Sequence, residues 1–423
     1  MEKFSLTIFS LKFNTIIELG YTEETSQIIF DFLSLFSVKI NNEIQTISID
    51  YKHQYTASLK EKINKYIDNY KNYLPQIQKI NTYFGKLEKN EWFFTLPPIE
   101  FNTRERYKLE EELNSINGYS SNITEDEKKL FDCIMDNYEI KTFDLNRHGK
   151  IKIGESNKSK RVCRFCKESK PAINFTKEAH AISEAIGNKK LILNEECDEC
   201  NEFFDKNIER DFFNFHRLSL TMHGIKGKDN KISKIKKDNA FEISKDKDSH
   251  EISIKHKEVK NFSIEPSQNL VFETGEKVKL QSLYKALCKF SLSVIESKYI
   301  EHFHDTMSWL KDQKQINSLP KVAILNSDGI LAKEPEIALY IRKNDNTSVP
   351  YLVGQLKFSC HMYIFIVPFS NQDKLNFIEE SEYNKFLNCF RQMANIRKFK
   401  YVDLSQNIER KLSLNIKFEK RKA

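Results

Sequence analysis

The sequence predicts an α+β protein in which a small cysteine-containing module separates two larger regions of mixed structure. Strand-like alternation and helical apolar spacing both occur along the chain, and 423 residues suffice for two or three domains that each bury a core. Two Cys-x-x-Cys pairs mark the module. We therefore divide the chain into an N-terminal mixed α/β domain (1–157), the module (158–220), a basic linker or hairpin (221–262) and a C-terminal α+β domain (263–423).

The N-terminal region alternates between strand and helix patterns. Apolar alternation predicts strands at Phe4–Phe13 and Ile44–Tyr51. Helical spacing predicts four helices, of which the second is interrupted near Pro75 and the last is capped by Thr124. These helices are Thr25–Phe36, Ala57–Phe84, Arg104–Ile116 and Glu125–Tyr138.

The module begins and ends with a cysteine pair. Cys163 and Cys166 form the first pair, and Cys197 and Cys200 form the second. Two such turns complete a tetrahedral four-cysteine zinc site, because each presents two thiolates to one ion. The alternatives are two disulfides or four free thiols, which we disfavour because nothing in the sequence indicates an oxidising compartment.

The segment between the pairs carries residues suited to nuclease chemistry. It contains the run Ala179-His-Ala-Ile-Ser-Glu-Ala-Ile-Gly-Asn188, and Asn201 follows the second pair directly. With CRFC and CDECN on either side, residues 160 to 215 resemble the HNH endonucleases, in the subgroup whose ββα-metal fold is braced by a four-cysteine zinc. The resemblance implies that His180 is a general base oriented by Asn194 or Asn188, and that Asn201 binds the catalytic ion.

The residue types fit phosphodiester hydrolysis. A histidine accepts a proton from water near pH 7, and a weakly held Mg²⁺ or Mn²⁺ stabilises the phosphate oxygens. The sequence departs from the family at Ala179, where a metal-binding Asp, Glu or His is usual. Either Glu178, Glu184 or Asp205 supplies the carboxylate, or the module binds nucleic acid without cutting it. Gly187 is expected to permit a positive φ or a close approach to phosphate.

A helix is predicted from Cys200 to about Leu220. Its phenylalanines are expected to pack against the rest of the protein rather than against bases, and His216 and His223 are expected at the surface or in packing. The segment 224–262 reads as flexible or as a β-ribbon. The net charge of +7 is concentrated locally, which predicts phosphate contacts, with a solvated lysine loop as the alternative. The candidates are Arg161, Arg164, Lys167, Lys226, Lys228, Lys231, Lys234, Lys236 and Lys237.

The C-terminal region reads as α+β. An amphipathic helix is predicted at Leu280–Tyr299, with Leu283, Leu287, Phe290 and Val294 on one face. Further helices are predicted at Phe303–Leu310 and Tyr383–Ile396. Strands are predicted at Lys321–Leu325, Ile337–Arg342, Tyr351–Phe358 and His361–Phe369. Apolar surroundings predict buried free thiols at Cys133, Cys288, Cys360 and Cys389.

These features favour a cytoplasmic, metal-dependent endonuclease that acts on DNA, with RNA as a second candidate substrate. No secretory signal or membrane-spanning run is recognisable. The resemblance suggests a bacterial restriction or anti-phage effector, and the flanking domains are candidates for sensing, DNA selection, oligomerisation or binding of a regulatory partner protein. The alternatives are a non-catalytic zinc-ribbon protein that binds nucleic acid and a scaffold subunit.

Overall fold

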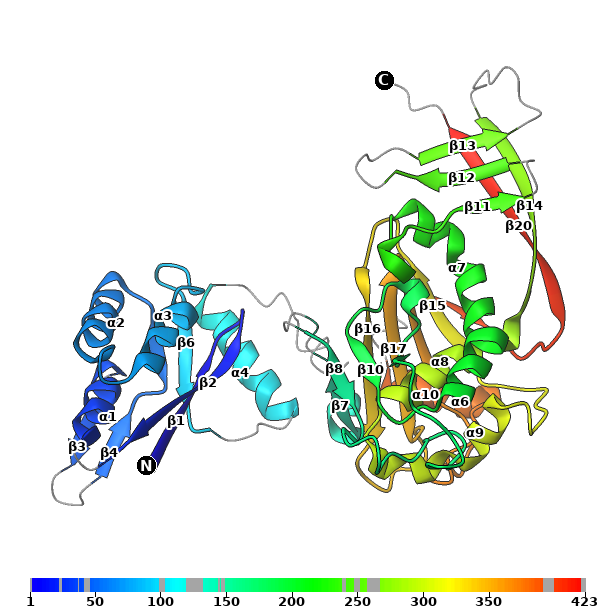
Figure 1. Ribbon diagram of the computed structural model, residues 1–423. Coiled ribbons are helices and arrows are strands. Elements are labelled where there is room, and N and C mark those ends of the chain that lie inside the picture. Colours follow the sequence, from blue (N-terminus) through cyan, green and yellow to red (C-terminus); the bar gives the residue numbers. More distant parts are fainter. Residues whose placement is uncertain are drawn as a thin grey trace. The chain divides into compact units, whose positions relative to one another are not determined.

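The computed structural model comprises two compact units, residues 1–128 and 129–423 (Figure 1). The structure describes residues 2–22, 25–36, 38–41, 46–98, 103–118, 132–143, 145, 149–237, 241–246, 252–256, 267–390 and 399–419. The predicted boundaries at 157, 220 and 262 all fall within the second of these units.

The first unit is built on a four-stranded antiparallel sheet in the order β2-β1-β6-β5. The strands are β1 (Glu2–Phe9), β2 (Asn14–Tyr21), β5 (Lys52–Gln54) and β6 (Trp92–Leu96). Helices α1 (Ser26–Leu33), α2 (Ala57–Tyr70) and α3 (Gln78–Phe84) share a core with β1 and β2, and α4 (Thr103–Ile116) contributes Leu113 to a second cluster. Strands β3 (Val38–Asn41) and β4 (Thr46–Ile49) pair with each other. As predicted, the helical stretch 57–84 is interrupted at Pro75.

The second unit contains a six-stranded antiparallel sheet in the order β19-β15-β18-β17-β16-β7. Its strands are β7 (Tyr138–Thr142), β15 (Val322–Asn326), β16 (Ala332–Arg342), β17 (Leu352–Ser359), β18 (His361–Ile366) and β19 (Phe399–Val402). Because side chains alternate along a strand, β18 contributes to two cores. Tyr363 and Phe365 join the cluster that contains α8 (Leu280–Val294), whereas Ile364 and Ile366 join the cluster that contains α10 (Glu380–Cys389).

Helix α8 lies at the centre of this unit. All fourteen residues from Gln281 to Val294 are buried, so the predicted exposed face does not exist. One hydrophobic core joins α8 to the sheet and to the cysteine module. Several of the polar side chains on the helix have partners: Tyr284, for example, donates to the carbonyl of Ile366 at 2.8 Å. The module therefore shares the hydrophobic core of the second unit.

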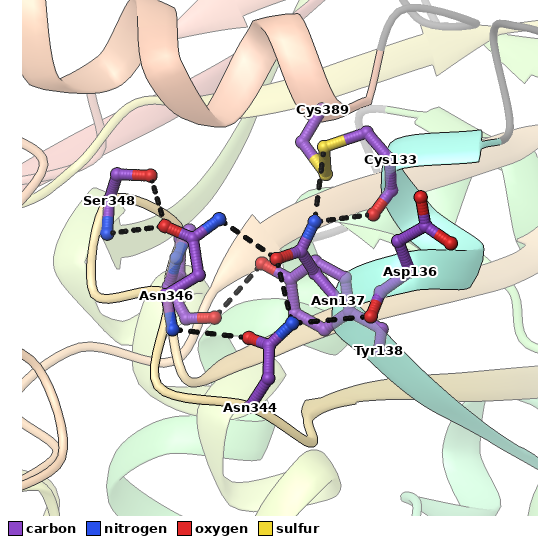
Figure 2. Close-up of a disulfide and its surroundings, with 9 residues drawn as sticks. Cys133, Asp136, Asn137, Tyr138, Asn344, Asn346, Ser348 and Cys389 are labelled. Carbon is purple, nitrogen blue, oxygen red and sulfur yellow. Dashed lines mark hydrogen bonds between the residues drawn. A yellow bond between two sulfur atoms is a disulfide. The ribbon is translucent and has the colours of Figure 1, made fainter.

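Cys133 and Cys389 form a disulfide (Figure 2), which corrects the prediction of free thiols at these positions. Cys133 lies just before β7, and Cys389 ends α10. Ile134 and Tyr138 share a hydrophobic cluster with α10, and residues 256 positions apart approach to a Cα–Cα distance of 5.0 Å. Cys288 and Cys360 are free and buried, as predicted.

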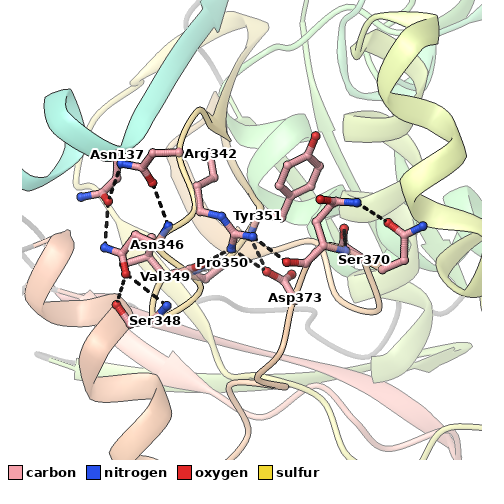
Figure 3. A network of polar contacts seen from close by, with 12 residues as sticks. Asn137, Arg342, Asn346, Ser348, Val349, Pro350, Tyr351, Ser370 and Asp373 are labelled. Carbon is pink, nitrogen blue, oxygen red and sulfur yellow. Dashed lines mark hydrogen bonds and ion pairs between the residues drawn. The ribbon is translucent and has the colours of Figure 1, made fainter.

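A polar network fixes the turn between β16 and β17 (Figure 3). Arg342 donates to the carbonyl of Val349 at 2.6 Å and pairs with Asp373 at 3.0 Å. The side-chain amide of Asn346 donates a hydrogen bond to Asn137 Oδ1, and Asn137 Nδ2 donates one to the backbone carbonyl of Cys133 (Figure 2). The network therefore ties this turn to the disulfide-bearing segment. Burial raises the pKa of Asp373 to about 6, although Arg342 opposes the shift.

The segment after the module contains a β-ribbon that begins at Ile235. Strands β11 (Ile235–Lys237), β12 (Phe241–Lys245) and β13 (Ile252–His256) form an antiparallel sheet. A long ribbon of β14 (Ser267–Lys279) and β20 (Glu409–Glu419) runs beside it (Figure 1). The predicted helical residues 125–131 and 391–396 lie outside the described residues. Within the described residues, no helix has both the length and the apolar character needed to cross a lipid bilayer.

Candidate metal centre and active site

A β-hairpin followed by a helix forms the framework of the module. Strand β9 (Ala179–His180) pairs with β10 (Leu191–Leu193), and β8 (Ile151–Ile153) extends this sheet. The helix begins as α6 (Asp198–Phe204), passes through a π-helical turn (Asp205–Glu209) and continues as α7 (Arg210–Met222). Its phenylalanines include the buried Phe204 and Phe212, in line with the predicted packing face. This ββα arrangement places the end of β9 beside the helix.

The four cysteines converge as predicted. Their Sγ atoms all lie within 4.8 Å of one another, and the atoms of Cys166 and Cys197 are 3.8 Å apart. A tetrahedral zinc with Zn–S bonds of about 2.3 Å places its sulfurs roughly 3.8 Å apart. Cys163, Cys197 and Cys200 are buried. The geometry and the donor set fit a closed, structural zinc site.

The four close thiols change one another's acidities. A hydrogen bond from Cys200 lowers the pKa of Cys163 to about 5. The same contact raises the pKa of Cys200, while burial raises those of Cys166 and Cys197. Once one of these closely packed thiols has ionised, the other three lose their protons less readily. A divalent ion removes this obstacle because it binds all four as thiolates.

Arg164 lies inside the protein, which corrects its assignment as a phosphate contact. Its side chain is 2% exposed and pairs with Glu195 at 2.6 Å. Nη1 donates to the carbonyls of Leu292, Ser293 and Ile295 at the end of α8. A cation at a helix C-terminus satisfies its free carbonyls and its dipole. Arg164 thus caps α8.

A cavity of about 380 Å³ opens between β9, its following loop and the helix. It is lined by His180 and Ser183 to Ala185 from the hairpin and by Asn201 and Glu202 from α6. The remaining lining residues are Lys177, Glu178, Asp205, Glu209 and Lys228. The predicted base and the predicted metal ligands therefore share one cavity, although they come from separate elements.

The His180 side chain faces this cavity and is 20% exposed. Its Nε2 lies 3.7 Å from a carboxylate oxygen of Glu184, and its buried Nδ1 has no hydrogen-bond partner among the described residues. Burial lowers the pKa of His180 below its usual 6.5, although Glu184 and Glu178 oppose the shift. The imidazole is therefore neutral at pH 7, as a proton acceptor must be.

The helix presents three side chains to the cavity at intervals of four residues. Asn201 and Asp205 are one turn apart, and neither side chain has a partner among the described contacts. In a regular α-helix, a residue eight positions on lies about 80° around the axis. A π-helical turn contains one extra residue, which compensates for this rotation of about 80°. Glu209 therefore lies on the same face of the helix as Asn201 and Asp205 and lines the cavity. Amide and carboxylate oxygens are the ligands that Mg²⁺ and Mn²⁺ prefer.

The comparison with known families agrees with this geometry. Residues 163–215 match the family described as HNH endonuclease. These residues form an HNH endonuclease domain. No curated protein and no solved structure matches the chain. A nucleic acid is the substrate class that an HNH domain implies.

Asn188 and Asn194, the two residues predicted to orient the His180 imidazole, lie close to the HNH hairpin, but neither forms a hydrogen bond with His180. The Asn188 amide donates to the carbonyls of Ile182 and Leu191 and accepts from two backbone amides, so it fixes the loop. Asn194 is buried, and its Nδ2 has no partner among the described residues. Gly187 has φ +104°, and a Cβ there would lie 3.1 Å from the carbonyl of Lys333. Both the positive φ and the close carbonyl disfavour any residue with a side chain at this position.

The position that departs from the family does not face the cavity. Ala179 is 2% exposed and contributes to the interior, because alternate residues of a strand face opposite sides. Of the candidate replacements, Glu178 pairs with Lys150, and Glu184 pairs with Lys189 at 2.7 Å. Asp205 is exposed and has no described partner. Asp205 is therefore the carboxylate most available to an ion.

The predicted phosphate-binding lysines differ in their surroundings. Lys234 and Lys236 both pair with Glu242, and Lys231 pairs with Asp229. Lys228 lines the cavity and has no described ion pair, while Lys167 and Lys226 are exposed. Arg161 donates to the carbonyls of Glu155 and Ser156. Lys228, from beyond the HNH domain, is thus a cavity-lining lysine without an ion-pair partner among the described residues.

The two later histidines pack away from the cavity. His216 is buried, and its Nε2 lies 2.9 Å from the hydroxyl of Tyr363. Burial lowers the pKa of His216 well below its usual value. His223 Nδ1 lies 2.7 Å from the Ser359 hydroxyl. Both therefore anchor α7 to the six-stranded sheet, as the packing interpretation predicted.

Proposed function

We propose that this protein is a metal-dependent endonuclease that hydrolyses phosphodiester bonds of DNA. The observation that carries the proposal is the shared cavity of His180, Asn201 and Asp205 within an HNH domain. Asn201 and Asp205 would bind one Mg²⁺ or Mn²⁺ ion. That ion supplies charge stabilisation to the non-bridging and leaving oxygens of the phosphate.

His180 serves as the general base in this proposal. Its neutral imidazole removes a proton from the attacking water, and its partial burial keeps it unprotonated at pH 7. Lys228 and Lys177 at the cavity attract phosphates. The structural zinc at the four cysteines holds the hairpin and the helix together, and takes no part in the reaction.

DNA is the proposed substrate, and a role in restriction or anti-phage defence is the proposed context. The first unit is a candidate for sensing, DNA selection, oligomerisation or binding of a regulatory partner protein. The reaction itself is proposed to take place in the cytoplasm.

A plasmid-nicking assay tests the proposal directly. Purified protein is incubated with supercoiled DNA, and in parallel with RNA, in EDTA, Mg²⁺ or Mn²⁺. We expect nicked and linear DNA with the divalent ions and intact DNA in EDTA. If neither nucleic acid is cut with any divalent ion, the non-catalytic nucleic-acid-binding function replaces the enzyme. The interior position of Ala179 is the observation that favours this second function.

A further inference from the structure

Lys289 is a charged residue at the centre of a hydrophobic core. It lies on α8, and its side chain is completely buried. Its ammonium group contacts three oxygen atoms: Glu209 Oε1 at 2.8 Å, Glu196 Oε2 at 3.2 Å and the backbone carbonyl of His180 at 3.3 Å. An ammonium group has three protons. The contacts equal these protons in number, although the one to Glu196 is an ion pair without hydrogen-bond geometry.

The cost of burying this charge indicates a specific role. An isolated ammonium in a protein interior is strongly unfavourable, and a buried ion pair is seldom better for stability than apolar packing. Burial alone lowers the pKa of Lys289, but Glu196 and Glu209 outweigh it and raise the pKa above its usual value. The lysine is therefore charged at every pH at which the protein works.

The three oxygen atoms come from three parts of the nuclease site. His180 carries the proposed base on β9, Glu196 directly precedes the zinc cysteine Cys197, and Glu209 lines the cavity at the end of the π-helical turn. Lys289 itself lies outside the HNH domain. One side chain from α8 thus joins the strand, the cysteine cluster and the helix.

We propose that Lys289 is a positioning residue of the nuclease, which fixes the His180 backbone and the Glu209 carboxylate at the cavity. The proposal rests on the proposed function, because it assigns Lys289 to the same reaction. Lys289 does not line the cavity, so it acts through His180 and Glu209 rather than on the substrate. Displacing a catalytic group by about 1 Å costs on the order of 10²-fold in rate.

The chain offers a matched control on the same helix. Lys285 lies one turn before Lys289, its side chain is 4% exposed, and it forms an ion pair with Asp312. Neither Lys285 nor Asp312 lines the cavity. Lys285→Met and Lys289→Met in the full chain therefore each remove a buried lysine charge, but only Lys289→Met releases the groups at the active site.

Two measurements on each variant separate positioning from folding. The first is the single-turnover rate of plasmid nicking, with duplex affinity measured in EDTA. We expect Lys289→Met to lose on the order of 10²-fold in rate, with affinity changed less than about twofold, and Lys285→Met to keep its rate. If both variants fold and Lys289→Met nicks plasmid at the same single-turnover rate as Lys285→Met, the proposal is wrong.

The second measurement does not depend on cleavage. In protein with ¹³C-labelled histidine, the imidazole signal of His180 is assigned by its loss in His180→Ala. Lys289→Met should shift this signal, and Lys285→Met should leave it in place. If wild-type protein cuts no nucleic acid, the proposed function fails while the His180 signal still decides whether Lys289 holds that residue. An unshifted signal in folded Lys289→Met overturns the proposal.

A double variant covers the case in which Lys289→Met does not fold. Removing the lysine leaves Glu196 buried without a counter-charge, and Glu196→Gln removes that charge at nearly constant shape. If Lys289 only neutralises Glu196, the double variant regains both its zinc content and its wild-type rate, which contradicts positioning. A double variant that folds and binds zinc but cuts on the order of 10²-fold more slowly supports it.

Discussion

The four-cysteine cluster and the cavity beside it come from the same stretch of chain but are organised in opposite ways. The cysteine sulfurs lie within 4.8 Å of one another and are mostly buried. At the cavity, the polar side chains are spread over several elements, and among the described residues no second group of three His, Cys, Asp or Glu side chains converges to ligand distance. A structural zinc needs a complete set of protein ligands, whereas Mg²⁺ commonly takes part of its coordination from substrate phosphate and water. The difference is consistent with the proposal that one centre supports folding and the other supports the reaction.

The sharpest test of this division removes the zinc ligand Cys197. We expect Cys197→Ser to abolish stoichiometric zinc binding and to unfold the module, because the binding free energy of structural zinc, on the order of 10 kcal/mol, is also folding free energy. Metal analysis and thermal unfolding measure both effects. Cys360→Ser is the control, since Cys360 is buried and free but lies outside the cluster. A folded wild-type protein without zinc would disprove the structural role.

Removing the proposed base, His180, should affect the cleavage rate without affecting zinc binding or folding. His180→Ala is expected to lower the cleavage rate by about 10²–10⁴-fold, because a general base contributes that much, and to leave zinc content and unfolding temperature near the wild type. His304→Ala is the control, as that side chain is 82% exposed. Normal cleavage by His180→Ala would show that another residue is the base.

The proposed metal ligand should affect the ion requirement more than the fold. Asp205→Asn is expected to raise the Mn²⁺ concentration for half-maximal activity by about tenfold or more, and Mn²⁺ should support more activity than Mg²⁺, because such ligands bind it more tightly. Glu202→Gln is the control, because Glu202 lines the cavity but already pairs with Lys177 and Lys206. Equal metal titrations for Asp205→Asn and wild type would exclude Asp205 as a ligand.

The acidity of His180 predicts the pH dependence of cleavage. A base acts only when deprotonated, and burial lowers the pKa of His180. The single-turnover rate should therefore rise with pH by about tenfold per unit in acid and level off below pH 6.5. An inflection above pH 6.5 would contradict the lowered pKa of His180 or its role.

The smallest expected effect concerns the cation at the cavity. Lys228→Gln should flatten the salt dependence of duplex binding by about 0.9 for one lost phosphate contact. Lys231→Gln, three residues on, replaces a lysine that pairs with Asp229 and should leave the slope unchanged. If Lys228→Gln and the wild type have the same salt dependence of duplex binding, Lys228 does not contact a phosphate and lies in a solvated loop.

The parts of this site that could be predicted from sequence are the local ones. A Cys-x-x-Cys turn defines its own geometry over four residues, so the cysteine cluster was predictable. The hairpin, and the helix that begins at the second pair, were implied by the resemblance to HNH endonucleases. The role of His180 in catalysis stays a prediction. Pairing across long separations was not predictable: no local pattern contains the Cys133–Cys389 disulfide or the β7–β16 pairing.

Charged residues were the main source of wrong expectations. Lys285 and Lys289 made α8 look amphipathic, and Arg164 looked like a phosphate contact, because charged side chains are usually exposed. Each is buried with an ion-pair partner instead. Glu209 and Glu196 were not singled out from the sequence for the same reason. Two lysines one turn apart in an otherwise apolar run were the one local signal that could have indicated buried partners.

The order of the chain gives the link between α8 and the HNH domain a consequence during synthesis. A ribosome that has just completed the HNH domain has not yet made Lys289 or the carbonyls that Arg164 caps. Roughly 80 further residues must be added, which takes on the order of 4–16 s at typical elongation rates. In the proposed mechanism, a nascent or prematurely terminated chain would therefore carry His180 and the cysteines without the lysine that positions His180, so incomplete copies would cut more slowly than the finished protein.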